Sequence, residues 1–123
     1  MQDQYAAFFV RWMLEKTYVE DELESLALEA WELAAHLSPP DLILDLRTAD
    51  QFTRAHLRGS INLTYNNFQG EAEEKTRGVA SVLLVDDAGA RAAEMAVWLR
   101  ARGVPARYLV GGISAWRGAL ERG

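Results

Sequence analysis

The segment 86–91 carries the residues best placed for chemistry. It lies between an apolar run at residues 81–85 and a helical pattern that begins at Ala92. Backbone N–H groups that curl at a helix start form a cradle for an anion, and Gly89 permits such a curl. Arg91 adds a guanidinium that can bind an anion at the edge of the cradle. The candidate site therefore consists of Asp86, Asp87, Ala88, Gly89, Ala90 and Arg91.

Alternating strands and helices are predicted around this segment. Apolar runs predict strands at residues 42–46, 60–63, 81–85 and 107–110, and helices are expected at residues 48–54, 92–102 and 113–120. Thr48 and Gln51 have the spacing of a capping box, and Gly103 is a typical helix stop. The polar, acidic residues 64–80 are expected to form a solvated loop that could contain a helical turn. The pattern predicts an α/β fold, a parallel sheet flanked by helices on both faces, with the segment 86–91 beyond a strand's carboxyl end, where ligands bind.

The first part of the chain has a different pattern. An apolar stripe at helical spacing runs from Tyr5 to Met13, and a second one ends before Pro39. Thr17 and Glu20 suggest a capping box between them, although residues 17–19 could equally form a short edge strand. We therefore expect residues 1–37 to be a helical segment and residues 38–123 to be the α/β domain. The exposed stripe would be a large apolar patch, so it should pack on the body or on a partner, including a second copy.

Composition excludes several kinds of function. The chain has 123 residues and no cysteine, which excludes disulfides, thiolate metal sites and a cysteine nucleophile. Two histidines are too few for a histidine-rich metal site, so we expect neither metal nor cofactor. The net charge of −5 disfavours nucleic-acid binding. Neither a signal peptide nor a membrane span is evident, and a soluble cytoplasmic protein is expected.

Several further motifs fall in a fixed order along residues 38–120. They are Leu42-Ile43-Leu44-Asp45-Leu46-Arg47, Gln51-Phe52, Ala55-His56-Leu57-Arg58-Gly59-Ser60-Ile61-Asn62, Arg91, Gly103, and Tyr108-Leu109 followed by Gly111-Gly112-Ile113 and Trp116. This series resembles the rhodanese-like domain family. The resemblance implies a parallel sheet flanked by helices, and sulfur transfer through a persulfide on a loop cysteine in a Cys-x-x-x-x-Arg motif. Counting back from Arg91 places Asp86 at the position of that cysteine.

The resemblance therefore predicts a rhodanese-like domain without sulfurtransferase activity, acting as a binding or regulatory module. Asp86 could place its own carboxylate in the cradle as an internal ligand, with Arg91 as a candidate ionic partner. Two enzyme alternatives stay open: a sulfurtransferase component that uses a partner's cysteine, or an anion-handling hydrolase that uses Asp86 or Asp87. The resemblance also implies that Asp45 and Arg47 form a structural pair rather than catalytic groups. His56 could serve as a base or ligand, but we expect it to be a buried, hydrogen-bonded structural histidine.

Overall fold

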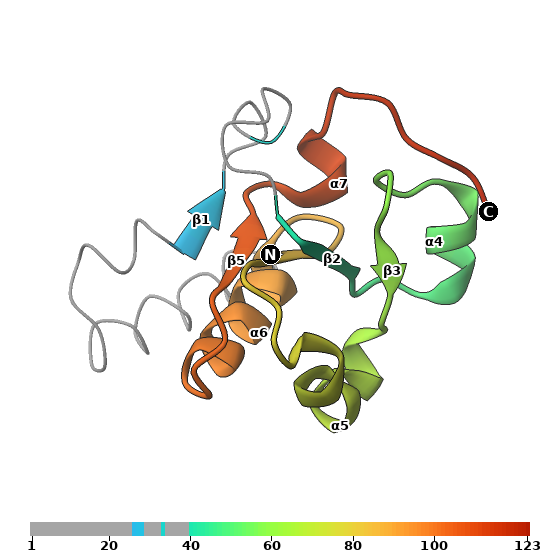
Figure 1. The fold of residues 1–123 in the computed structure, drawn as a ribbon. Helices are drawn as coiled ribbons and strands as arrows, with labels where there is room; N and C mark the ends of the chain where they lie inside the picture. Colours follow the sequence, from blue (N-terminus) through green and yellow to red (C-terminus); the bar gives the residue numbers. More distant parts are fainter. Residues whose placement is uncertain (1–25, 29–32, 34–39) are drawn as a thin grey trace.

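A computed structural model describes residues 26–28, residue 33 and residues 40–123 of the chain. Its centre is a five-stranded parallel sheet with the strand order β1-β5-β4-β2-β3 (Figure 1). The strands are β1 (Ala27–Leu28), β2 (Leu42–Asp45), β3 (Ile61–Asn62), β4 (Val82–Val85) and β5 (Ala106–Leu109). Every residue of β4 is buried, as expected for the middle strand of a parallel sheet covered on both faces.

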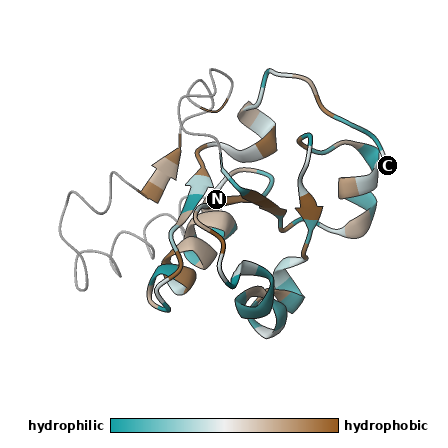
Figure 2. Cartoon of the chain, viewed as in Figure 1, coloured by the Kyte–Doolittle hydropathy of each residue, from teal (hydrophilic) through white to brown (hydrophobic). Residues whose placement is uncertain are grey.

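Helices cover both faces of this sheet. They are α4 (Ala49–Arg54), α5 (Tyr65–Thr76), α6 (Ala90–Arg100) and α7 (Gly112–Ala115). On one face, Leu84 belongs to a buried cluster with Phe68 of α5 and Ala96 of α6. On the other, Leu83 belongs to a smaller buried cluster, against which the partly buried Ile113 of α7 packs. The predicted α/β architecture is confirmed, and the hydropathy colouring in Figure 2 shows the apolar strand β2 between more polar helices.

The start of α4 follows the sequence prediction in detail. Thr48 Oγ1 accepts a hydrogen bond from the Gln51 N–H, and Gln51 Oε1 accepts one from the Thr48 N–H. This reciprocal pair is the expected capping box and satisfies two N–H groups that the helix itself leaves unpaired.

The expected loop at residues 64–80 is wrong, because residues 65–76 form α5. Phe68, Ala72 and Thr76 are buried along one side of this helix at intervals of four residues. The polar and acidic residues between them obscure so narrow an apolar stripe. Packing on the core, rather than a strong local pattern, therefore determines this helix.

Two further elements differ from the prediction. The expected helix 113–120 ends at Ala115, and Trp116 is extended, with its indole N–H donating to the carbonyl of Ala119 over 3.1 Å. Ala27 and Leu28, which we expected in a helix, form strand β1 and pair with β5. Main-chain pairing with a sheet edge overrides helical spacing there. The remaining residues of segment 1–37, including residues 17–19 and the Tyr5 to Met13 stripe, lie outside the described residues except Leu26 and Leu33. The division at residue 37 stays a prediction.

No helix within the described ranges is long and apolar enough to span a membrane.

Candidate functional site

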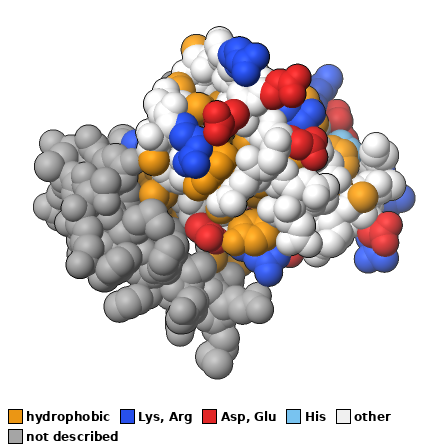
Figure 3. Space-filling model, turned by 90° about the horizontal axis from the view of Figure 1, so that it is seen from below, with side chains coloured by type: hydrophobic (Ala, Val, Ile, Leu, Met, Phe, Trp, Pro, Cys, Tyr) orange, Lys and Arg blue, Asp and Glu red, His pale blue; other side chains and the backbone are white. Residues whose placement is uncertain are grey.

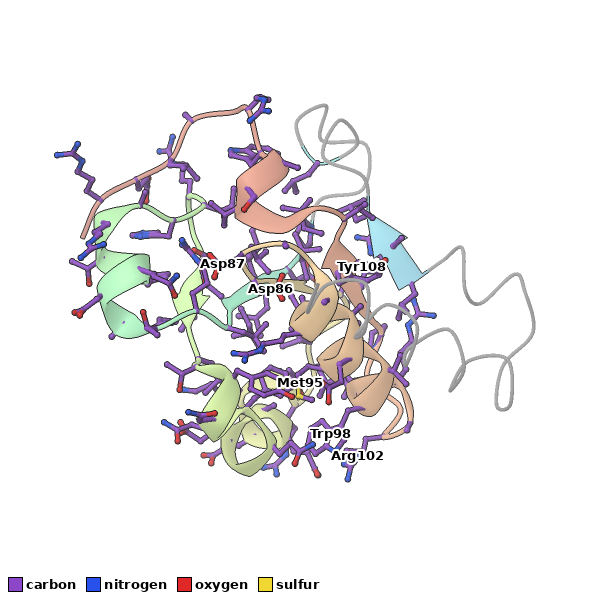
Figure 4. All side chains as sticks on the ribbon, turned by 180° about the vertical axis from the view of Figure 1, so that it is seen from behind. Asp86, Asp87, Met95, Trp98, Arg102 and Tyr108 are labelled. Carbon is purple, nitrogen blue, oxygen red and sulfur yellow. The ribbon has the colours of Figure 1, made fainter. Side chains whose placement is uncertain are left out.

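The segment 86–91 leaves the carboxyl end of β4 and enters α6, and the Asp86 side chain turns back into this loop (Figure 4). Asp86 is only 7% exposed. Its Oδ1 accepts a hydrogen bond from the Gly89 N–H, and its Oδ2 accepts from the N–H groups of Arg91, at 2.8 Å, and Ala92, at 3.1 Å. The carboxylate therefore occupies the centre of a cradle of backbone N–H groups.

Two glycines allow the loop to curl this tightly. Gly89, the N-cap of α6, has a φ of 108°, in the left-handed region, and a Cβ there would lie 3.2 Å from the Gly111 nitrogen. Gly112 in α7 has a φ of 58°, and a Cβ on it would lie 2.6 Å from the carbonyl carbon of Asp87. At both positions two backbone segments pack directly against each other, so a side chain there would collide with the opposite backbone.

The start of α7 fixes the outer side of the loop. The Ile113 N–H donates to the Asp86 carbonyl and the Ser114 N–H donates to the Asp87 carbonyl, each over 2.9 Å. With these carbonyls held by α7, the N–H groups that follow in the loop are free to face the Asp86 carboxylate. The β5–α7 turn is therefore part of what shapes the cradle.

Opposing effects act on the charge of Asp86. Burial removes the carboxyl from water and raises its pKa above the ordinary value, and the nearby Asp87 charge adds to the rise. The hydrogen bonds from Ala92, Gly89 and Arg91 act in the opposite direction, because N–H donors favour the anion. Burial has the largest effect, so the net direction is upward.

The rim of the loop carries an arginine and a tyrosine that face each other. The Arg91 guanidinium lies over the Tyr65 ring, 4.7 Å from its centroid, so it is the Arg91 backbone that binds Asp86. The Tyr65 hydroxyl donates to Glu94 Oε1 over 2.8 Å, and burial together with this bond to a carboxylate raises the pKa of Tyr65. Tyr65 and Glu94 were not identified from the sequence, because Tyr65 lies in the segment expected to be a loop.

Asp87 points away from the cradle toward α4 (Figure 4). It is exposed, and the Gln51 side-chain amide donates to its Oδ2 over 3.2 Å. Gln51 thus joins the start of α4 to the loop, a role beyond the helix cap that its spacing predicts. Ala88 is half-buried, and the buried Ala90 is the first residue of α6.

Asp45 and Arg47 form a buried ion pair at the end of β2. Their Oδ2 and Nη2 atoms are 2.8 Å apart, and Arg47 also donates to the Ala55 carbonyl. Asn62 Nδ2 donates to the main-chain carbonyls of both Asp45 and Arg47, at 3.0 and 2.9 Å. These bonds connect three segments of the chain, and the structural role of the pair stays a prediction.

His56 is buried between α4 and residues near Glu121. Its ring stacks on Phe52 with centroids 3.9 Å apart, and its Nδ1–H donates to the Phe52 carbonyl over 2.8 Å. It is 6% exposed and lies away from the cradle, with its partners in α4 and the chain's last residues. The expected buried, hydrogen-bonded histidine is what the geometry displays.

Other surfaces of the described residues add little to this site. No cluster of His, Cys, Asp or Glu within residues 26–28, 33 and 40–123 could hold a metal ion. A groove of about 490 Å³ lies at the opposite ends of the strands, beside Thr76, Arg77 and Val104. Figure 3 shows acidic and basic side chains interspersed on the face seen from below.

Comparison with protein families gives a match to the model of the rhodanese-like domain over residues 29–119. A comparison with curated protein sequences gives no match. The family match covers most of the chain and includes β2, the segment 86–91 and α7.

Solved structures share the fold. A rhodanese-like domain protein from Staphylococcus aureus has 24% identity and a TM-score of 0.68, over 79% of this chain and 97% of that one. A protein from Bacillus halodurans has 18% identity and a TM-score of 0.70, over 82% of this chain and 80% of that one. A thiosulfate sulfurtransferase from Pseudomonas aeruginosa has 22% identity and a TM-score of 0.68, over 80% of this chain, which spans only 20% of that longer one.

Proposed function

The chain belongs to the rhodanese-like domain family, and we propose that it is a member without sulfurtransferase activity, acting as a binding or regulatory module. One observation carries the proposal: the carboxylate of Asp86 accepts the N–H groups of Gly89, Arg91 and Ala92. In this family's sulfur-transfer chemistry that place belongs to a sulfur nucleophile. In this chain the loop holds the carboxylate of its own Asp86 in place of a sulfur nucleophile.

Sulfur transfer needs a thiolate at the centre of the loop. The thiolate attacks the outer sulfur of thiosulfate, the bond between the two sulfur atoms breaks, and sulfite leaves with the electron pair. Cyanide then takes the outer sulfur from the persulfide as thiocyanate, which restores the thiolate. A carboxylate cannot form a persulfide, and the chain has no cysteine to replace it.

The test is a thiosulfate-to-cyanide assay on the purified chain and on two loop variants. We expect no thiocyanate above the blank from the natural chain. Asp86→Cys should form thiocyanate if the cradle still stabilises an anionic sulfur, whereas the matched Asp86→Ser, which has an oxygen in place of that sulfur, should not. Turnover by the natural chain would refute the proposal.

One of the two enzyme alternatives is tested by the same assay. A component that borrows a partner's cysteine should gain activity when cell extract is added, above that of extract alone. Hydrolysis by Asp86 is disfavoured because both of its oxygens already accept hydrogen bonds from the loop. Asp87, which is exposed, stays the better candidate for such a role.

The partner is proposed to be another protein, with residues 1–37 packing on the body or joining two copies. Light scattering coupled to size-exclusion chromatography distinguishes these arrangements, since a strict monomer excludes the dimer. The cytoplasmic location stays a prediction from the sequence.

A further inference from the structure

Helix α5, at the lower edge of the molecule in Figure 1, packs on the core through a narrow side. Of its 12 residues only Phe68, Ala72 and Thr76 are buried, whereas seven residues of α6, on the same face of the sheet, are buried. Phe68 meets the Trp98 ring of α6 edge-on, with the centroids 6.0 Å apart. Because tertiary packing supplies most of a helix's stability, α5 is held more weakly than α6.

The local sequence of α5 adds little stability to the helix. Gly70 lies in its middle, where glycine costs more conformational entropy on folding than alanine would. Within the described residues, the N-cap Thr64 makes no side-chain hydrogen bond to the first turn. Glu73 and Glu74 lie in the last turn, where the partial negative charge of a helix end disfavours them and only Lys75 opposes this effect. The helix therefore depends on its contacts with the rest of the chain.

Polar contacts near both ends tie α5 to α6. The Tyr65 hydroxyl donates to Glu94 Oε1 over 2.8 Å, and Arg102 Nε donates to Glu73 Oε1 over 3.1 Å between exposed side chains. The Tyr65 ring also covers one face of the Arg91 guanidinium at the rim of the candidate site. A movement of α5 away from α6 would therefore withdraw Tyr65 from both Glu94 and Arg91.

We propose that α5 opens as a unit, separately from the sheet and from α6, and that this opening uncovers the Arg91 guanidinium. In the closed form the Tyr65 ring lies against the guanidinium. In the open form the guanidinium is free to turn its N–H groups toward an anionic group of a partner. The opening goes beyond the proposed function and does not depend on it, since it follows from the packing of α5 and needs neither a partner nor an anion in the cradle.

Amide hydrogen exchange of the full chain, followed by NMR at urea concentrations below the unfolding transition, tests the opening. The readout is the protection factor of the Ala72 and Thr76 amides in α5, compared with that of Ala96 in α6 and Leu84 in β4. We expect the α5 amides to be protected about tenfold less or more weakly still. Their protection should also depend less on urea, because a separate opening exposes less surface than global unfolding. Equal protection and equal urea dependence in all three elements would overturn the proposal.

Two helix-favouring substitutions separate local from global opening. Gly70→Ala should raise the protection of the α5 amides about two- to fivefold, because it favours the closed helix and no described atom lies within 4 Å of the new Cβ. Thr53→Ala is the matched control at an exposed position of α4, and it should raise the protection of Leu84 but not that of the α5 amides. An equal rise for α5 and Leu84 in Thr53→Ala would show that α5 opens only with the whole protein, which would overturn the proposal.

Tyr65→Phe tests whether the rim of the candidate site moves with α5. The variant keeps an aromatic ring beside Arg91 and removes the hydrogen bond to Glu94. If that bond breaks when α5 opens, the protection of the α5 amides should fall about two- to tenfold, the effect of one hydrogen bond. Unchanged protection would mean that Tyr65 stays in place when the helix opens, so that the opening does not uncover Arg91 and the proposal is wrong.

Discussion

The N–H of Arg91 donates to Oδ2 of Asp86 over 2.8 Å, while the Arg91 guanidinium lies over the Tyr65 ring outside the loop. The backbone and the side chain of this arginine therefore face different surroundings. The backbone helps to close the cradle around an internal carboxylate, and the guanidinium stays on the rim, where a partner can reach it.

Replacing Asp86 with asparagine should destabilise the protein. The side-chain nitrogen of asparagine cannot accept a hydrogen bond. The backbone N–H groups that now donate to one carboxylate oxygen would therefore lose their acceptor and face the N–H groups of the new side chain instead. We expect the free energy of unfolding to fall by about 1–3 kcal/mol, the cost of unsatisfied buried polar groups. Urea denaturation measures it. The exposed Asp87→Asn is the control and should change stability by about 0.5 kcal/mol or less. An equally small effect of Asp86→Asn would contradict the internal-ligand interpretation.

The pH dependence of stability should report Asp86 with a definite sign. Burial raises its pKa in the folded chain above the ordinary 3.8, so the folded state binds this proton more tightly than the unfolded state. The contribution of Asp86 to stability therefore falls as the pH rises from its pKa in the unfolded chain through its pKa in the folded chain. Above the folded-state pKa this contribution is constant. Protonated Asp86 still offers acceptor lone pairs on both oxygens, which asparagine does not.

The measurement is the difference in unfolding free energy between the natural chain and Asp86→Asn, from pH 3.5 to 7. The free energy of unfolding of the natural chain minus that of Asp86→Asn should stay positive and decline from pH 3.5 to pH 7. A difference that rises with pH would mean that the N–H donors outweigh burial, and that the pKa is lowered instead.

Gly112→Ala should destabilise the protein and disturb the loop. The new Cβ would lie 2.6 Å from the Asp87 carbonyl carbon, in addition to the strain of a positive φ. Gly103→Ala is the matched control, because Gly103 also has a positive φ, 83°, but open space around its Cβ. Strain at such a φ costs about 1–3 kcal/mol, and Gly112→Ala should exceed its control by at least ~1 kcal/mol in denaturant melts. Equal losses would show that the loop tolerates movement of α7.

Asp45→Asn should be among the most damaging substitutions. It removes the charge that pairs with Arg47, whose guanidinium is buried with it at the end of β2. Breaking a buried pair from one side costs about 3–5 kcal/mol, so thermal unfolding should occur at a markedly lower temperature. The exposed Asp41→Asn serves as the control and should leave the melting temperature nearly unchanged. A decrease in melting temperature as small as that of Asp41→Asn would contradict a structural role for the pair.

Much of the fold could be predicted from local signals. The apolar run before Asp86, the Thr48–Gln51 spacing and the alternation of elements all led to the correct architecture. α5 could not be predicted, because its apolar side consists of little more than Tyr65, Phe68 and Ala72 and its stability comes from packing on the core. β1 was missed because strand formation at Ala27 depends on β5, far away in the sequence.

In the candidate site, too, some residues could be predicted from local sequence and others could not. The segment 86–91 was predictable because its residue types are consecutive, and the glycine that permits the curl is among them. Gly112 and Tyr65 reach the loop from other elements, so their contacts depend on tertiary structure.

The proposed function requires that Asp86 fill the cradle and leave no room for an external anion. The most direct test is an NMR titration with thiosulfate, following the amides of Gly89, Arg91 and Ala92 in the natural chain and in Asp86→Ala. We expect no saturable shift of these amides in the natural chain, and saturable shifts in the variant, whose emptied cradle can take the anion. Saturable shifts of the same amides in the natural chain would contradict it.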